Sequence, residues 1–351
     1  MAGRTVLLAL LLFSVDAGAF AQKVQIGVLG LFHPMEITLS ATEHEALVLR
    51  AADKVFVLEA GTRTGVAHLR AAEDDLVLEI DGQFVHAKRI FATGRDLLSA
   101  RFLLGVPGKI TRNYQGTLEV KAARGEVVPI VTMDMETAVA SVVAAESDMN
   151  SPLEALKAQA VVTRSYVLAG KGRHQDFDFC DLTHCQFLRE PPGPESLATV
   201  AANATRGLVI GYAGRPVAAM FTRSCGGSTR TPVELGIASS NYPYYAVRCE
   251  ACYRAPRRWT RRISLQEAAR LLGKGEAGRL AVDRRLGWNR VPSNNFAARV
   301  EEGEVILEGV GEGHGVGLCQ RGAKAMAESG SSFREIIAYY FPNTKMTRVA
   351  P

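Results

Sequence analysis

The chain has 351 residues, a formal net charge of +5 and 47% hydrophobic residues. This length is typical of about two domains, and the apolar content is sufficient for packed cores. The charge excess is mild, and the sequence contains neither a low-complexity tract nor a nucleic-acid-binding motif, so we expect no nucleic-acid partner.

Residues 1–21 have the features of a secretory signal peptide. Arg4 is followed by an apolar run at 6–15, and Ala19-Phe20-Ala21 is an A-x-A cleavage site. A buried N-terminal helix is the alternative. The run is shorter than the ~20 residues of a membrane span, and no other segment qualifies. We therefore expect an exported protein that begins near Gln22, lies in the periplasm or on the cell-wall side of the membrane, and has no stable membrane span.

Residues 22–111 are predicted to form a β-rich domain of barrel or sandwich type. Short runs of β-branched and apolar residues alternate there with turn formers such as Asp81-Gly82. The runs cover residues 24–31, 35–41, 46–50, 54–60, 75–80 and 83–92.

The next part of the chain is predicted to be helical. Residues 135–147 have helical spacing, and a second helix is expected to end at Gly170. Ser151 is the expected N-cap of that helix, Pro152 its first residue, and Glu154 the partner in an S-x-x-E capping box.

Helices and hairpins alternate in the remaining sequence. A helix is expected between residues 194 and 207, partly helical structure over 263–290, and helices in 323–329 and from a second capping box at 332–335. Hairpins are expected over 208–221 and 298–311. Without a βαβ alternation, the pattern predicts the α+β class.

Two histidines and two cysteines lie within twelve residues: His174, Cys180, His184 and Cys185. This is a donor set that a tetrahedral structural zinc prefers, and it leaves no open position for water. A disulfide between Cys180 and Cys185 is the alternative, since an exported protein can form disulfides.

The other four cysteines are Cys225, Cys249, Cys252 and Cys319. The sequence favours a disulfide of Cys225 with Cys249 or Cys252 over a second metal site at Cys249-x2-Cys252. The pairing cannot be assigned from spacing.

A candidate acid lies at the corner between the first two helices. Glu146 adjoins an apolar helix end, where burial would raise its pKa and allow it to protonate a leaving oxygen. An exposed helix-terminal glutamate is the alternative. Arg164 could hold a substrate carboxylate or form a structural salt bridge. His314 lies between two glycines, which permit close approach of a ligand.

Four segments in order resemble the SpoIID/LytB family, which comprises stage II sporulation protein D and the amidase enhancers. They are AAES with SPLEALKAQAVVTRSYVLAG at 144–170, FDFCDLTHCQ at 177–186, SCGGSTRTP at 224–232 and GHGVGLCQRGAKAMAES at 313–329. The resemblance covers roughly residues 112–348. It implies a mixed helical and β domain with a glycan cleft at 112–351, after the β-rich domain.

The resemblance implies a lytic transglycosylase of peptidoglycan that cleaves the MurNAc–GlcNAc β-1,4 bond of glycan strands without water and leaves a 1,6-anhydroMurNAc end. Denuded strands are the expected substrate. Glu146 would be the catalytic acid and then base, and Arg164 a second catalytic residue. His174, Cys180, His184 and Cys185 would bind a structural zinc. Ser224, His314 and Gln320 are assigned to substrate binding. Many relatives read S-E-M-P around the glutamate, whereas this chain has Ala145-Glu146-Ser147.

Two alternatives remain. The protein could be a non-catalytic glycan-binding enhancer of a cell-wall amidase partner, because the same cleft would serve both functions. It could also be a zinc hydrolase with a catalytic metal, against which four protein ligands argue.

Overall fold

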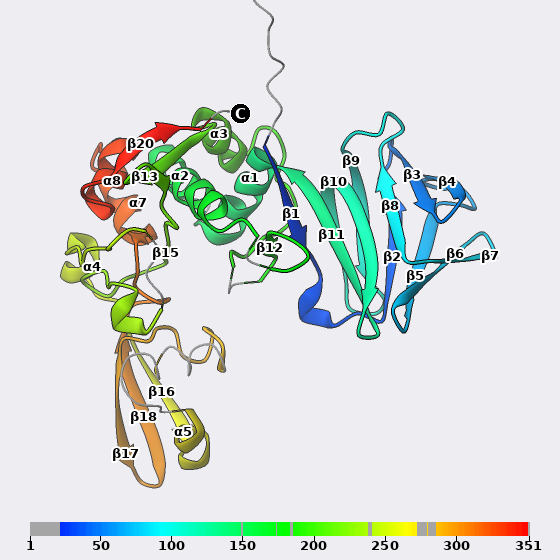
Figure 1. Cartoon of the computed structure of the whole chain (residues 1–351). Coiled ribbons are helices and arrows are strands. Elements are labelled where there is room, and N and C mark those ends of the chain that lie inside the picture. The colour runs from blue at the N-terminus through cyan, green and yellow to red at the C-terminus, as the bar shows by residue number, and fades with distance from the viewer. Residues whose placement is uncertain are drawn as a thin grey trace, which may run out of the picture.

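A computed structural model describes residues 22–148, 150–172, 174–182, 185–237, 241–271, 279 and 286–349. The predicted signal peptide and His184 lie outside these residues. The fold is of the expected α+β class, with a large curled antiparallel sheet beside a group of helices (Figure 1). Among the described helices, none has the length and apolarity needed to cross a lipid bilayer.

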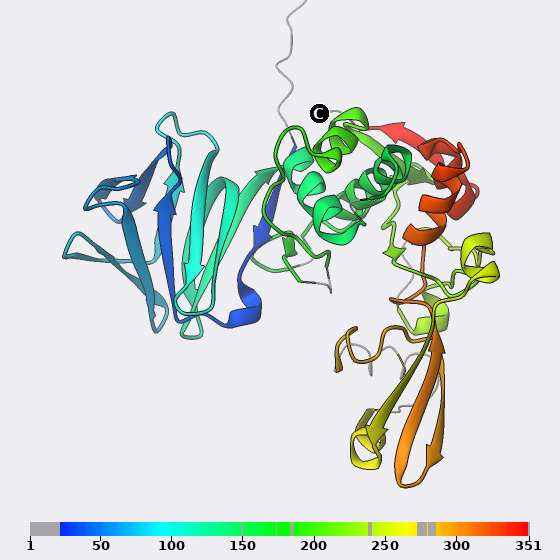
Figure 2. The same ribbon diagram turned by 180° about the vertical axis from the view of Figure 1, so that it is seen from behind.

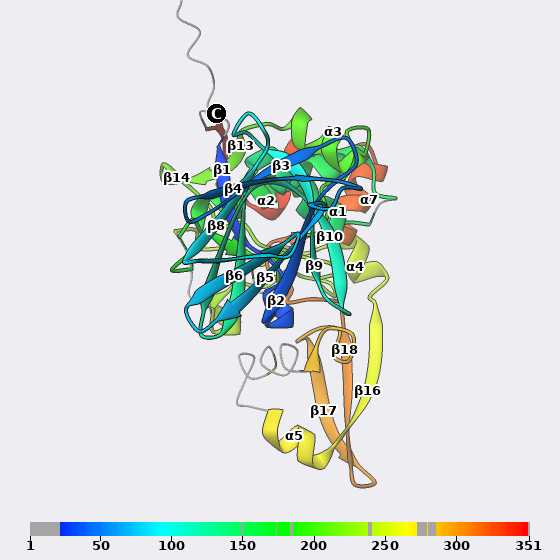
Figure 3. The same cartoon turned by 90° about the vertical axis from the view of Figure 1, so that its right-hand side faces the viewer.

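The first part of the described chain forms this large sheet. Its strands are β1 (Lys23–Gly27), β2 (Glu36–Ala41), β3 (Ala46–Ala51), β4 (Lys54–Glu59), β5 (Val66–Ala72), β6 (Asp75–Ile80), β7 (Gln83–Ala87), β8 (Arg89–Thr93), β9 (Ala100–Val106), β10 (Ile110–Ala123), β11 (Glu126–Asp134) and β12 (Phe179–Cys180). The main order is β12-β1-β11-β10-β9-β2-β5-β6-β7, and β8 pairs with both β10 and β3. A short 3-10 helix, Gly30–Phe32, follows β1. Figure 3, viewed from the side, shows the sheet curling on itself.

The strands of the curled sheet bury one of their two faces. In β2, β3 and β6 every second residue is buried, so one face of each strand lines a common core. Leu39 of β2, for example, is opposite Ala67 of β5 and Leu104 of β9, and all three are buried. These contacts bear out the β-rich segment expected from the sequence.

The sheet continues beyond residue 111, where a boundary between domains is expected from the sequence. β10 spans this position and pairs with β9 along its first half and with β11 along its second half. Gly116 permits the close crossing there, since a Cβ would lie 2.3 Å from the carbonyl oxygen of Thr132. The two sides of residue 111 are thus parts of one hydrogen-bonded sheet.

Helices α1 (Met135–Glu146), α2 (Leu153–Ala169) and α3 (Leu197–Ala204) lie beside the sheet. Helix α2 is buried on nearly all sides. Leu156 and Ala160 pack into the core shared with the sheet, whereas Val161 and Val162 pack into a second core. This position between two cores explains why α2 is buried on nearly all sides, although its buried residues include Gln159 and Arg164.

The N-terminus of α2 differs from the prediction. Pro152 precedes the first helical residue and no side chain caps the helix, so the expected capping box of Ser151 and Glu154 is wrong. Instead Glu154 accepts hydrogen bonds from Lys157 and from the main-chain N–H of Phe333, at 2.7 and 2.8 Å. These contacts, one of them with the start of α8, draw the Glu154 carboxylate away from the N-terminus of α2.

The second core lies among α2 and the C-terminal elements. These are β13 (Leu208–Tyr212), β14 (Arg215–Pro216), β15 (Phe221–Thr222), β19 (Leu318–Cys319), α7 (Gln320–Glu328), α8 (Phe333–Tyr340) and β20 (Lys345–Arg348). β13 pairs with β14 as the expected hairpin, and β15 pairs in parallel with β19. The predicted capping box of Ser332 and Glu335 is confirmed at α8.

A small third unit projects from this half of the molecule. It contains β16 (Arg258–Ser264), α5 (Leu265–Leu271), β17 (Phe296–Glu301) and β18 (Glu304–Val310), in the sheet order β16-β18-β17. β17 and β18 form the second expected hairpin. Figures 1 and 2 show that the unit extends away from the helices, below the short helix α4 (Glu250–Arg254). A 3-10 turn, Val233–Leu235, lies in the connection that precedes α4.

Candidate functional site

Glu146 is the last residue of α1, at the corner before α2 as expected. Its Oε1 accepts a hydrogen bond of 3.0 Å from the main-chain N–H of Phe187. Its own main-chain carbonyl accepts one of 3.1 Å from the side-chain amide of Gln320. The end of α1 is therefore fixed from two directions, by the segment after β12 and by the start of α7.

Burial changes the acidity of this carboxyl. Desolvation raises the pKa of Glu146 above its usual value, although the hydrogen bond from Phe187 and the charges of Arg223 and Arg189 act in the opposite direction. Because burial disfavours the charged form, the proton is retained to higher pH than on an exposed glutamate. The direction is the one that a general acid requires.

A cavity of about 780 Å³ adjoins the same corner. It is lined from α1–α2 by Ser147, Asp148, Ser151 and Gln159, from the C-terminal elements by Leu318, Gln320, Arg321 and Lys324, and from the connections by Arg223, Ser224, Arg257 and Glu312, among others. The volume lies in the range of pockets that hold small ligands. Glu146 is not itself a lining residue, whereas Ser147, the next residue, is.

The structure brings two of the three predicted substrate-binding residues into this cavity. Gln320 and Ser224 both line it. His314 does not; it is half-buried, and its Nδ1 accepts a hydrogen bond of 3.0 Å from the N–H of Val316. That bond shapes the glycine-rich turn around the histidine.

Arg164 has a structural position and forms the buried salt bridge that the sequence left open as the alternative to a substrate contact. Its side chain is fully buried and forms a bidentate pair with Glu136, through Nε at 3.0 Å and through Nη2. The remaining donors reach the carbonyls of Leu208 and Ala202 at 3.0 and 3.2 Å. The guanidinium thus joins α1, α3 and β13 and offers no group to the cavity.

The charged residues that line the cavity were not predicted from the sequence as site residues. Glu312 lies 2.7 Å from Arg257 and 3.5 Å from Arg223, and Lys324 lies 2.8 Å from Asp148. Arg257 directly precedes β16, and Glu312 lies two residues after β18. Their proximity depends on the return of the chain from the small sheet, which local sequence does not reveal.

The predicted metal loop is compact in its described part. The ligand atoms of His174, Cys180 and Cys185 all lie within 4.8 Å of one another, and His174 Nε2 is 3.3 Å from Cys185 Sγ. His184, the fourth expected ligand, lies outside the described residues. Cys180 and Cys185 are both buried, and one imidazole with two thiols is a donor set that suits zinc.

This loop is attached to the sheet and leads directly to Glu146. β12 pairs in parallel with β1, and the buried carboxylate of Asp181 accepts from the N–H of Leu29 at 3.1 Å and from Arg112 at 3.2 Å. Two residues after Cys185, the N–H of Phe187 binds the Glu146 carboxylate. The position of the loop therefore controls the position of that hydrogen-bond donor.

Comparison with known proteins identifies the segment that contains this corner. The family described as SpoIID: Stage II sporulation protein matches residues 123–212. These residues belong to the SpoIID family. The resemblance predicted from the sequence motifs is thereby confirmed.

Three relatives extend the similarity. An uncharacterized protein of Brachyspira hyodysenteriae is 27% identical over 65% of this chain and 70% of its own length. The stage II sporulation protein D of Bacillus amyloliquefaciens is 25% identical over 60% of this chain and 74% of its own. The amidase enhancer of Bacillus subtilis is 36% identical over 18% of this chain, which is 9% of its own length.

The SpoIID match contains Glu146, Arg164 and the described metal-loop residues, but it ends before Ser224, His314 and Gln320. It also ends before the other four cysteines. Cys225, Cys249, Cys252 and Cys319 are buried free thiols whose sulfurs lie within 4.8 Å of one another. The expected disulfide of Cys225 is therefore wrong. The spacing of the cysteines in the sequence could not show that four thiols converge.

Proposed function

We propose that this protein is a lytic transglycosylase that cleaves the MurNAc–GlcNAc β-1,4 bond in glycan strands of the bacterial cell wall. The observation that carries the proposal is the Glu146 carboxyl. It is buried enough for its pKa to be raised, yet it lies beside a cavity of about 780 Å³. A protonated carboxyl in that position suits donation to a glycosidic oxygen.

The reaction requires one acid that becomes a base. Glu146 donates its proton to the leaving oxygen, the C1–O bond breaks, and the sugar's own 6-hydroxyl attacks the oxocarbenium-like carbon. The carboxylate then takes the hydroxyl proton, so that the enzyme returns to its starting state. No second carboxylate is needed, in contrast to ordinary glycosidases. The Phe187 N–H orients the carboxyl during both steps.

A structural zinc fits the loop beside this acid. His174, Cys180 and Cys185 would hold it, with His184 as the fourth ligand expected from the sequence. The ion would fix the segment that carries the Phe187 N–H and would not contact the reacting bond. Such a role is consistent with a closed set of protein ligands.

The cations of the cavity suit an anionic sugar. Arg223 and Arg321 line it with Gln320 and Ser224. A muramic acid from which the stem peptide has been removed carries a free lactyl carboxylate, which an arginine binds well. We therefore favour denuded glycan as the substrate.

The direct test is mass spectrometry of products from the purified protein and defined denuded glycan strands. The proposal predicts fragments with 1,6-anhydroMurNAc ends, 18 Da lighter than hydrolytic products because no water is added. Hydrolytic ends would contradict it, and so would intact strands from a folded protein.

A second function has its own support. Glu146 is not a lining residue of the cavity, and the relative in Bacillus subtilis is an amidase enhancer. A protein that binds glycan at this cavity and stimulates a cell-wall amidase would not require the acid. Glycan binding and amidase stimulation that persist in Glu146→Gln, without any anhydro product from wild type, would favour this function.

A further inference from the structure

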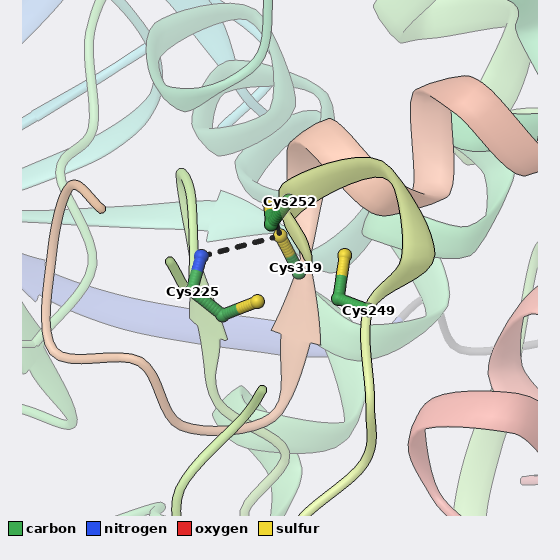
Figure 4. A group of neighbouring side chains, drawn as sticks. All are labelled: Cys225, Cys249, Cys252 and Cys319. Carbon is green, nitrogen blue, oxygen red and sulfur yellow. Dashed lines mark hydrogen bonds between the residues drawn. The ribbon is translucent and has the colours of Figure 1, made fainter. Parts of the chain in front are cut away.

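The four cysteines outside the SpoIID match come from three separate parts of the chain. Cys225 follows β15, Cys249 and Cys252 lie at and within α4, and Cys319 ends β19. Figure 4 shows their side chains pointing toward a common centre. Their relative exposures are 3%, 1%, 0% and 0%, in that order, so solvent does not separate the thiols.

The distances between the sulfurs distinguish a metal site from disulfides. The Sγ atoms of Cys252 and Cys319 are 3.6 Å apart, and all four lie within 4.8 Å of one another. A disulfide requires about 2.05 Å and joins sulfurs in pairs. Four thiolates at about 2.3 Å from a tetrahedral zinc lie ~3.8 Å apart, which is close to the spacing here.

The surroundings suit negatively charged sulfurs. The N–H of Cys225 donates to Cys319 Sγ at 3.4 Å, as the dashed line in Figure 4 marks. The hydroxyl of Tyr340 donates to Cys249 Sγ at 3.4 Å, and the hydroxyl of Ser224 lies 3.4 Å from Cys252 Sγ. Cys319 is also the N-cap of α7, whose dipole favours a thiolate. Donors of this kind stabilise and orient metal-bound thiolates.

We propose that Cys225, Cys249, Cys252 and Cys319 form a structural tetrathiolate zinc site. One Zn²⁺ binds four sulfurs, and the four thiols release four protons to solvent. No coordination position remains for water or substrate, so the site is structural rather than catalytic. Zinc undergoes no redox change, and the sulfurs stay at their thiol oxidation level.

The site would fasten the small projecting unit to the rest of the protein. The chain enters that unit after Cys252 and returns from it before Cys319, and the ion joins these two points to Cys225. Ser224 and Ala251, which are sequence neighbours of ligands, line the cavity described above. Metal at this position would therefore also hold one wall of the cavity.

The test must separate this site from the loop at His174. Zinc per chain is measured by mass spectrometry on full-length protein purified without chelator, for wild type, Cys185→Ser, Cys252→Ser and the double variant. We expect Cys185→Ser to retain one zinc and the double variant to retain none. Loss of all zinc in Cys185→Ser, with fold retained by circular dichroism, would overturn the proposal.

X-ray absorption on the Cys185→Ser protein identifies the ligands. An all-sulfur shell of four atoms at about 2.3 Å supports the proposal, and a shell with nitrogen or oxygen contradicts it. Iron instead of zinc would overturn the assignment of the metal. Non-reducing peptide mapping of wild type provides a readout that does not depend on the folding of Cys252→Ser. A peptide that joins any two of the four cysteines by a disulfide would overturn the site.

Discussion

The side-chain amide of Gln320 donates a 3.1 Å hydrogen bond to the main-chain carbonyl of Glu146. The two residues are 174 positions apart in sequence. This bond joins the C-terminus of α1 to the N-terminus of α7 and places Gln320, a lining residue of the cavity, beside the candidate acid. The SpoIID segment therefore depends on residues outside it for the position of its own glutamate.

Glu146→Gln should alter the pH dependence of stability. Because the folded-state pKa of Glu146 is raised by burial, ionisation favours the unfolded chain. Wild type should lose stability relative to Glu146→Gln as pH rises above the usual glutamate range, and the loss should stop once pH passes the folded-state pKa. Urea unfolding of both proteins measures the difference in unfolding free energy. The measurements run from about pH 4 to pH 8, a range that includes the usual glutamate pKa. A difference that is constant with pH would show that burial does not shift this group.

Glu136→Gln should be strongly destabilising, because it leaves the Arg164 guanidinium buried without its counter-charge. Removal of one partner from a buried pair costs about 3–5 kcal/mol. The double variant Glu136→Leu, Arg164→Met should lose less than the sum of its single variants. Additive losses in a double-mutant cycle of unfolding free energies would contradict the pairing.

Ser332→Ala should destabilise the protein through loss of the α8 cap. The Ser332 side chain accepts from the N–H of Glu335, and the Glu335 carboxylate binds the Ser332 N–H at 2.8 Å. Loss of such a cap costs about 0.5–2 kcal/mol. Ser151→Ala is the matched control, since Ser151 caps no helix, and its cost should be smaller. Equal shifts in unfolding free energy would contradict the assignment of the caps.

Gly322→Ala should destabilise the fold even though alanine favours helix. A Cβ at Gly322 would lie 1.9 Å from the Tyr340 hydroxyl and 2.6 Å from Cys249 Sγ. Overpacking of this kind costs about 1–3 kcal/mol, because α7 must shift to make room. This cost exceeds the ~1 kcal/mol that alanine gains over glycine in helix propensity. Gly193→Ala, with open space around its Cβ, is the control. Thermal denaturation that shows Gly322→Ala to be stabilised would refute this packing.

Local patterns predicted most of the elements. Alternating strands, the hairpins at β13–β14 and β17–β18, and the cap at Ser332 all follow from contacts between residues close in sequence. The cap at Ser151 failed because the N–H of Phe333 competes for Glu154. Periodicity could not report that contact, since the two residues are 179 positions apart.

The candidate site divides in the same way. Glu146 could be predicted as the candidate acid because it ends an apolar helix. His174, Cys180 and Cys185 could be predicted as metal ligands because they cluster in sequence. The sequence left the role of Arg164 open between a substrate contact and a salt bridge, and for the other four cysteines it favoured a disulfide over a metal site. Burial of Arg164 depends on α3 and β13, and the cysteine cluster depends on the return of the chain after β18. Both arrangements follow from tertiary packing and not from spacing.

The most direct test of the central claim compares product formation by Glu146→Gln and wild type on denuded glycan strands. A general acid contributes about 10²–10⁴ in rate, so we expect anhydro products to fall by at least about 100-fold, while folding and glycan binding persist. Glu195→Gln, an exposed glutamate of the same segment, should retain wild-type product levels. Undiminished 1,6-anhydroMurNAc formation by a folded Glu146→Gln protein would contradict the assignment of Glu146 as the acid.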